Sequence, residues 1–285
     1  MKVDLLPGVF ARRDPETAPA PVVFDIPRSG SEYPRHFRSI ASLTDLQKSV
    51  SSFVEELYSG VTGSGATWLY AAFPNAFIDP NRHELDIDPE SLDGPWPVPL
   101  KPSPKTSTGI GLIPMVCAGT RPIYDGKLAV ADVEARLAGY YWPYHNELAR
   151  LIAGFRERFG VAYHLSCHSM SEFIAGNGPD AGTRRSDFDL GDRNGTTCGR
   201  ALVDVVAETL TGFGYKVTVN AHYVGAEAVR KHGDPKNGVH SLQIEMNRGL
   251  YMNEATRVRS GRFPEIQQHL AALSERLAAF ARAGA

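Results

Sequence analysis

Short apolar runs alternate with amphipathic segments along most of this chain, and this order constrains the fold more than any other feature. Runs typical of buried strands occupy residues 21–26, 67–73, 76–79, 161–167, 215–219 and 239–246. Apolar residues recur at helical spacing over residues 43–60, 130–159, 201–213, 226–231 and 264–283. Pro143 is expected to kink or divide the longest of these segments. The alternation predicts an α/β fold with a mixed, mostly parallel twisted sheet and helices on both faces.

Length and composition predict the domain organisation. A chain of 285 residues allows one large domain or two small ones, at roughly 100–200 residues per domain. No break in composition divides the chain, so we expect one domain over residues 21–285. Residues 1–20, rich in Pro and Ala and without periodicity, are expected to form an N-terminal arm. The proline-rich segment 79–127 is either a functional connection or a long surface loop.

Charge and cysteine content narrow the class of protein. The chain has 30 basic and 32 acidic residues, a formal net charge of −2, which argues against nucleic acid as a partner. No run approaches the ~18 apolar residues of a membrane span, and the N-terminus lacks the apolar core of a signal peptide. The three cysteines form no CxxC pair. We therefore expect a reduced, cytoplasmic protein without disulfides.

His168 lies where an expected strand ends, a common place for functional residues in open α/β sheets. Cys167 precedes it, but neighbouring strand residues point to opposite faces, so the two do not form a nucleophile–base pair. His164 shares the face of His168 but lies roughly 13 Å away, too far to bind the same metal ion. A histidine in this position is either a ligand or a structural core residue.

Two charged residues lie near other strand ends. Glu245 emerges from an apolar run, and burying an unpaired carboxylate is costly, so it is either functional or paired with an arginine such as Arg248. Arg82 follows the expected strand 76–79. A guanidinium there suits bidentate binding of a ligand carboxylate, although a structural ion pair is the simpler interpretation.

An ordered set of segments resembles the N-formylglutamate amidohydrolase family. The matching residues are 22–30, 79–82, 141–145, 167–170, 187–198 and 241–252. The resemblance covers nearly the whole chain and implies a zinc-carboxypeptidase-like fold. It also implies zinc-dependent hydrolysis of N-formyl-L-glutamate, a small carboxylate-bearing substrate, to formate and glutamate, the last step of one histidine-degradation route.

The resemblance assigns roles to individual residues. Glu245 takes the place of the carboxylate that acts as general base. His168 matches one of three zinc ligands, and zinc held in this way polarises a carbonyl and acidifies water. The expected substrate-binding residues are Asn81, Arg82, Asn247 and Arg248.

The other two expected zinc-ligand positions are substituted. Arg28 stands where the family has a histidine, and Ser51 where it has an acidic residue. An arginine stays protonated, offers no lone pair and repels Zn²⁺. His168 alone does not make a zinc site.

Three interpretations stay open. In the first, the chain is a catalytically silent relative in which Arg28 supplies the metal's positive charge, pairs with Glu245 and binds a carboxylate or peptide ligand. In the second, a relocated metal is held by His168 with other residues. The candidates for these are Asp25, His36, Glu55 and Glu56. In the third, hydrolysis is metal-free and slow, with Arg28 polarising the carbonyl and Glu245 activating water. The oligomeric state does not follow from the sequence.

Overall fold

The computed structural model describes residues 2–176 and 178–284 and has an eight-stranded sheet at its centre. The strands are β1 (Val3–Leu6), β2 (Phe10–Arg13), β3 (Val22–Ile26), β4 (Thr67–Ala71), β7 (Ala162–Met170), β8 (Phe188–Gly191), β9 (Val217–Val219) and β10 (Val239–Asn247). Their order is β1-β2-β4-β3-β7-β10-β8-β9. The central strands β4, β3, β7 and β10 are parallel, so their carboxyl ends meet at one edge.

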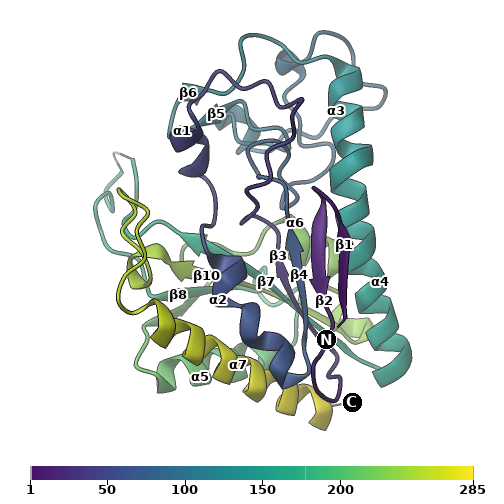
Figure 1. Cartoon of the computed structure of the whole chain (residues 1–285), viewed down its shortest axis with the longest axis vertical. Coiled ribbons are helices and arrows are strands. Elements are labelled where there is room, and N and C mark those ends of the chain that lie inside the picture. The colour runs from purple at the N-terminus through teal and green to yellow at the C-terminus, as the bar shows by residue number, and fades with distance from the viewer. Residues whose placement is uncertain (1, 177, 285) are drawn as a thin grey trace.

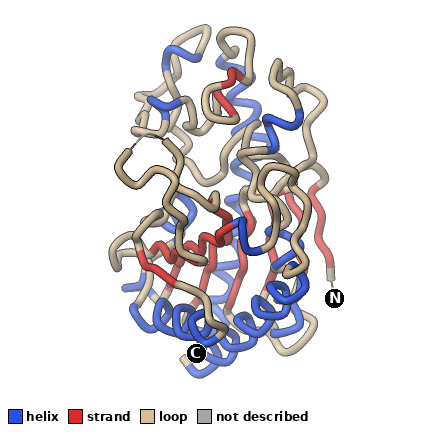
Figure 2. The backbone as a smooth tube through the Cα atoms, turned by 90° about the vertical axis from the view of Figure 1, so that its left-hand side faces the viewer, coloured by secondary structure: helices blue, strands red, loops and turns tan. Residues whose placement is uncertain are grey.

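Helices cover both faces of the sheet, as predicted. They are α1 (Leu43–Gln47), α2 (Val54–Leu57), α3 (Val130–Arg136), α4 (Trp142–Phe159), α5 (Arg200–Gly212), α6 (Glu227–His232) and α7 (Phe263–Ala283). Helices α2, α5 and α7 pack on one face, and α4 and α6 on the other (Figure 1). Figure 2 shows a loop-rich layer above the sheet, opposite the helices at the bottom. This layer includes the small β5 (Val116–Cys117) and β6 (Arg121–Pro122) pair.

The two faces of the central strands differ in chemistry because side chains alternate along a strand. In β7, Leu165 and Cys167 belong to the apolar core with α5 and α7, whereas the residues between them are polar. β10 follows the same rule, with Leu242, Ile244 and Met246 in that core. The opposite face carries a buried polar row. Its members include Asp25, His164, Ser166, His168, Ser241, Gln243 and Glu245.

Segment 43–60 is not the single helix expected from its periodicity. Helix α1 ends at Gln47, and α2 begins only after Phe53, whose φ of 66° is left-handed. The break lets the backbone N–H of Ser51 donate to the carbonyl of Arg28 (2.8 Å). Ser51 therefore lies beside Arg28.

Several other elements differ from the sequence expectation. Residues 76–79 form a turn rather than a strand, and Asp79 N–H donates to the carbonyl of Leu112 (2.8 Å). Strand β8, which pairs with β10 and β9, is not among the strands expected from the sequence. Within the expected arm, the hairpin β1–β2 extends the sheet by pairing with β4.

The long helical segment contains the irregularity expected at Pro143. Helices α3 and α4 run on from one another along one side of the molecule (Figure 1), joined by a π-helical turn at Leu137–Tyr141. Proline lacks an N–H and crowds the carbonyl four residues earlier, which accounts for wider i→i+5 bonding there. Tyr141 consequently reaches the site loop, and its hydroxyl donates to the carbonyl of Arg82 (3.0 Å).

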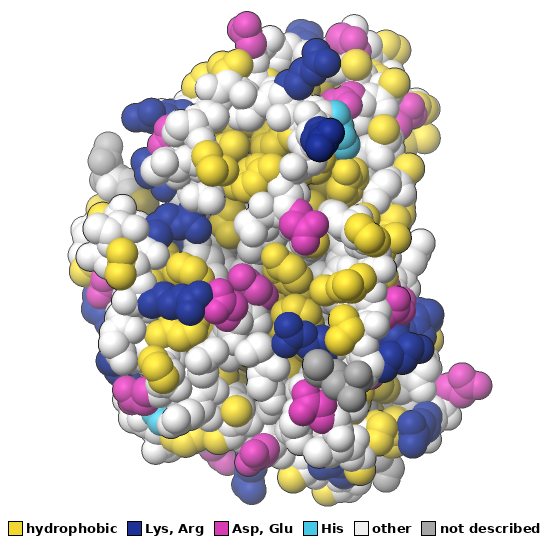
Figure 3. Space-filling view, viewed as in Figure 1, with side chains coloured by type: hydrophobic (Ala, Val, Ile, Leu, Met, Phe, Trp, Pro, Cys, Tyr) yellow, Lys and Arg dark blue, Asp and Glu magenta, His cyan; other side chains and the backbone are white. Residues whose placement is uncertain are grey.

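The surface carries charges of both signs (Figure 3), and the cysteines are unpaired among the described residues. Figure 3 shows basic and acidic side chains interspersed on one face of the molecule. All three cysteines are buried and free. Within the described residues, no helix is long and apolar enough to cross a membrane.

Candidate functional site

His168 and Glu245 lie side by side at the carboxyl edge of the sheet. Strands β7 and β10 are in parallel register, and the two residues are direct partners across the pair. Both side chains belong to the polar face and are almost completely buried. The sequence placed each residue at a strand end, and the tertiary structure makes the two strands neighbours.

The Glu245 carboxylate is buried without an ion pair. Its Oε1 accepts a hydrogen bond from Nε2 of Gln243 (3.0 Å). Among the described residues no Lys or Arg nitrogen lies within 4.0 Å of it. Burial raises the pKa of Glu245 to about 7, against the opposing charges of Arg28 and Arg248. A carboxylate with this pKa can take up and release a proton near neutral pH.

Arg28 pairs with Asp79, and not with Glu245 as in the first of the three interpretations. The distance from Arg28 Nη2 to Asp79 Oδ2 is 3.4 Å, and the buried Arg28 Nε has no hydrogen-bond partner among the described residues. Gly30 allows this loop to lie against the end of β4, because a Cβ there would stand 2.1 Å from the carbonyl oxygen of Phe73. The Arg28 charge thus acts on Glu245 from its position beside Asp79, and its Nε remains available as a donor.

The His168 imidazole is buried and neutral. Its Nε2 lies 3.2 Å from Nδ2 of Asn81 and 3.0 Å from Oγ of Ser166, whereas its buried Nδ1 has no partner in the described part of the chain. Burial and the charges of Arg28 and Arg82 hold the pKa of His168 well below its ordinary value. The ring can therefore offer one N–H or one lone pair at Nδ1, but no positive charge.

A buried polar chain continues behind His168. Ser166 Oγ lies 3.1 Å from Asp25 Oδ2 and 3.0 Å from His168 Nε2, and Asp25 accepts from the hydroxyl of Tyr144. His164 Nε2 lies 3.3 Å from the same carboxylate. His164 is thus a core residue linked to His168 through hydrogen bonds, and shares no ligand-binding position with it.

Sequence analysis did not single out Ser166 or Gln243. The signal was present, because residues 163–168 and 241–247 alternate polar and apolar side chains without interruption. In parallel strands buried on both faces this alternation is unusual, since such strands are ordinarily apolar throughout. It marks the face that carries the site.

Asn81 and Arg82 lie in the turn that follows β4 and face the same site. Asn81 Oδ1 accepts from the backbone N–H of Ala228 (2.9 Å). Arg82 donates from Nε to the carbonyl of Ile110 (3.0 Å) and has no carboxylate partner among the described residues. Burial lowers the pKa of Arg82, and the charge of Asp79 opposes this effect. The unpaired guanidinium suits an incoming carboxylate.

Asn247 and Arg248 hold neighbouring loops. Asn247 Nδ2 donates to the carbonyl of Ser186 (3.2 Å), and its Oδ1 accepts from Gly249 N–H (2.9 Å). Arg248 Nε donates to Ser169 Oγ (3.1 Å), and its Nη1 pairs with Glu254 (3.3 Å). Because both side chains form hydrogen bonds or ion pairs within the protein, we assign them a structural role. The charge of Arg248 also lowers the pKa of Glu245.

Residues 20–252 match the N-formylglutamate amidohydrolase family. The chain belongs to this family. Over 98% of its length it is similar to all of the N-formylglutamate amidohydrolase from Ralstonia eutropha JMP134, with 40% identity and a TM-score of 0.92. It is 29% identical to N-formylglutamate deformylases of Pseudomonas aeruginosa and Pseudomonas putida, in alignments that cover 70% of each chain.

The residues at the expected family zinc site do not fit a zinc ion. Arg28 brings a permanent positive charge and no lone pair. The Ser51 hydroxyl accepts a hydrogen bond from the backbone N–H of Ser169 (3.2 Å) and so has a structural role. His168 is left as one neutral ligand beside two guanidinium charges, where a divalent cation is repelled.

The residues considered for a relocated metal are engaged elsewhere. Asp25 accepts from Tyr144, Glu55 from Ser29, and Glu56 pairs with Arg259. The His36 ring packs edge-on against Phe77 (5.2 Å between ring centroids). None of these side chains converges with His168 on a common point within the described part of the chain.

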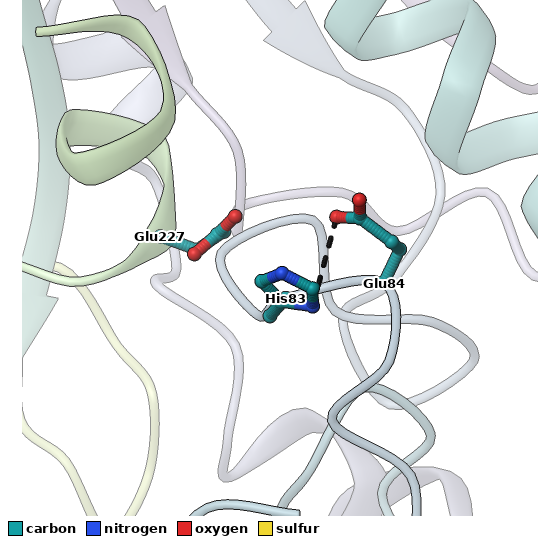
Figure 4. A group of neighbouring side chains, drawn as sticks. All are labelled: His83, Glu84 and Glu227. Atoms are coloured by element: carbon teal, nitrogen blue, oxygen red, sulfur yellow. Dashed lines mark ion pairs between the residues drawn. The ribbon is translucent and has the colours of Figure 1, made fainter. Parts of the chain in front are cut away.

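One group of potential ligands does converge, away from His168. In Figure 4, His83, Glu84 and Glu227 face one another with ligand atoms within 4.8 Å. Arg230 binds both carboxylate oxygens of Glu227 at 2.6 Å, and Lys231 pairs with Glu84 (3.4 Å). These cations already neutralise the carboxylates, so we assign the group to ion pairing between α6 and the turn after β4.

Proposed function

We propose that the protein hydrolyses the amide bond of a small N-acyl amino acid, with N-formyl-L-glutamate as the first substrate to test. The observation that carries this proposal is the Glu245 carboxylate, buried without an ion pair and with its pKa raised to about 7. Such a group is a suitable general base at neutral pH. The names of the relatives, deformylase and amidohydrolase, support the same reaction class.

Several cations act on the site, which favours a substrate with carboxylate groups. Within residues 2–176 and 178–284, Arg82 has no anionic partner, and Arg28 has a single long contact to a carboxylate, that of Asp79 (3.4 Å). Burial lowers the pKa of Lys105, as do the charges of Arg82, Arg28 and Arg185. Bringing these charges together is costly unless an anion binds. N-formyl-L-glutamate carries two carboxylates, and Arg82 is placed to bind one of them.

The chain's own residues suffice for a complete hydrolytic cycle. Glu245 takes a proton from water as the water oxygen attacks the acyl carbon, and the carbonyl oxygen becomes negatively charged. Arg28 stabilises this oxyanion through charge and hydrogen bonding. The C–N bond then breaks, Glu245 passes its proton to the leaving amine, and the products are formate and the amino acid. Because no metal acidifies the water in this scheme, we expect slow turnover.

A second candidate function rests on the substitution at Arg28. An arginine in place of a metal ligand also suits a protein that binds a carboxylate ligand without turning it over. The cytoplasmic location and the place in histidine breakdown implied for the family stay predictions for this chain.

The test measures binding and turnover separately on protein purified without a His tag and treated with chelator. Calorimetry with N-formyl-L-glutamate reports binding, and coupled detection of formate reports turnover at high enzyme concentration. We expect both in the native protein, and formate release to disappear in Glu245→Gln with binding retained. Binding without formate release above the Glu245→Gln level would favour the silent relative and overturn the hydrolase.

A further inference from the structure

The hydrogen bonds around His168 determine which ring nitrogen carries its proton. The backbone N–H of Ala228 donates to Asn81 Oδ1 (2.9 Å), so the NH₂ group of Asn81 is the end that faces His168 Nε2 at 3.2 Å. The neighbouring amide is oriented in the same way, because Ala226 N–H donates to Gln243 Oε1 (2.9 Å). Two backbone donors therefore set the orientation of both amides.

An amide donor that faces Nε2 requires a lone pair on that nitrogen. The single proton of the neutral imidazole is then on Nδ1. A doubly protonated ring would set one N–H against another, at a buried position with no water to relieve the conflict. The Ser166 hydroxyl has a single proton, and in this arrangement it donates that proton to Nε2 (3.0 Å), while Asp25 accepts from the hydroxyl of Tyr144.

The Nδ1–H group of His168 is an unsatisfied hydrogen-bond donor within the described part of the chain. It is buried, and no partner for it exists among the described residues. Arg28 Nε is a second donor in the same condition. A buried N–H without a partner is costly, and such groups are rare in proteins unless a ligand completes them.

We infer that His168 Nδ1–H and Arg28 together bind an oxygen of the ligand, a carbonyl or carboxylate oxygen, at the place where the family is expected to hold zinc. A metal ligand needs a lone pair at Nδ1, and the Asn81 amide removes it. The positive charge of Arg28 favours an anion at the same point. The inference rests on the proposed function only for the identity of this oxygen, the acyl carbonyl of the substrate.

Three measurements test the inference, and none needs turnover. Two-bond ¹H–¹⁵N correlation spectra of ¹⁵N-histidine-labelled protein report the tautomer, with the His168 signals assigned from His168→Gln. We expect the Nδ1–H form. An Nε2–H form, or a doubly protonated ring at pH 7, would overturn the proposal. Because this readout is independent of activity, a failed hydrolase test leaves it unaffected.

The second measurement uses zinc alone. We expect the chelator-treated native protein to take up no stoichiometric zinc by calorimetry. In Asn81→Asp the new carboxylate accepts from Nε2–H and still accepts from Ala228, which moves the proton and frees the Nδ1 lone pair. The double variant Asn81→Asp with Arg28→His should bind zinc measurably, and more tightly than either single variant does. Stoichiometric zinc on the native protein that is lost in His168→Gln contradicts the inference.

The third measurement uses formate as a probe of the oxygen site. We expect saturable formate binding to the native protein and a loss of about 10-fold or more in affinity in His168→Gln, as for a lost hydrogen bond to a charged acceptor. Asn247→Asp, the same change at a residue without a contact to His168, is the control for Asn81→Asp and should leave the His168 tautomer unchanged. Equal formate affinity in native protein and His168→Gln would show that Nδ1–H takes no part.

Discussion

The guanidinium of Arg28 pairs with Asp79, at 3.4 Å from Nη2 to Oδ2, and leaves the carboxylate of Glu245 without an ion pair. Asp79 also accepts the backbone N–H of Asn81 through Oδ1 (3.0 Å), so the same carboxylate orients the turn that carries Arg82. Because Arg28 pairs with Asp79 and not with Glu245, the pKa of Glu245 stays high while the positive charge of Arg28 remains in the site.

Activity and stability should depend on pH in opposite ways through Glu245. Its pKa is raised from 4.5 to about 7 by burial, so the native state holds this proton more tightly than the unfolded chain does. The stabilising contribution is complete below pH 4.5 and is lost as the pH rises through about 7. Formate release, which needs the carboxylate, should rise over the same range. Glu245→Gln should remove this component of the denaturation midpoint–pH profile, and an unchanged profile would contradict the assignment.

Removing the Arg28 partner should shift the activity profile to lower pH. In Asp79→Asn the amide oxygen can still accept from Asn81 N–H, but the charge that holds Arg28 is gone. Arg28 is then free to turn toward Glu245 and to lower its pKa. The rising limb of activity should move below pH 7. A limb that stays in place, in a variant that is folded by circular dichroism, would show that Asp79 does not govern Arg28.

Restoring the family ligands should create a metal site. The double variant Arg28→His with Ser51→Asp replaces a positive charge by a neutral ligand and adds a carboxylate beside His168. We expect zinc binding in calorimetry that is absent from the native protein, and weaker in either single variant. If the double variant gains no zinc affinity, then Ser51 and Arg28 do not occupy the ligand positions.

Gly30 should tolerate no larger residue. In Gly30→Ala the Cβ would stand 2.1 Å from the carbonyl oxygen of Phe73, and backbone atoms there cannot yield easily. We expect a loss of about 2 kcal/mol or more in the free energy of unfolding. Gly63→Ala, where a Cβ meets nothing within 4 Å, is the matched control and should change stability far less. Urea denaturation distinguishes the two.

The Tyr141 hydroxyl should matter for substrate binding more than for the chemical step. Tyr141→Phe removes its hydrogen bond to the carbonyl of Arg82 (3.0 Å) but keeps the packing. We expect a cost of about 1 kcal/mol in stability and a rise in KM with little change in kcat, because Arg82 binds the ground-state carboxylate. A fall in kcat with unchanged KM would place Tyr141 in the reaction step instead.

The α/β class and the strand ends that carry His168 and Glu245 could be predicted from local patterns. Periodicity reports which residues share a face of one helix or strand. The helix break at Phe53 and the turn at residues 76–79 could not be predicted in this way. Local propensity favours a continuous helix and a strand there, but hydrogen bonds to distant segments, such as Ser51 to Arg28, stabilise the irregular backbone instead.

By itself the sequence determined the family, the polar residues at the strand ends and the presence of Arg28 where a zinc ligand was expected. Only the tertiary structure decided the partners of these residues: Asp79 with Arg28, Gln243 with Glu245, and Asn81 with His168. The reason is that pKa values and tautomers depend on burial and on donors from distant segments. The backbone N–H of Ala228, for example, orients Asn81 from 147 residues away along the chain.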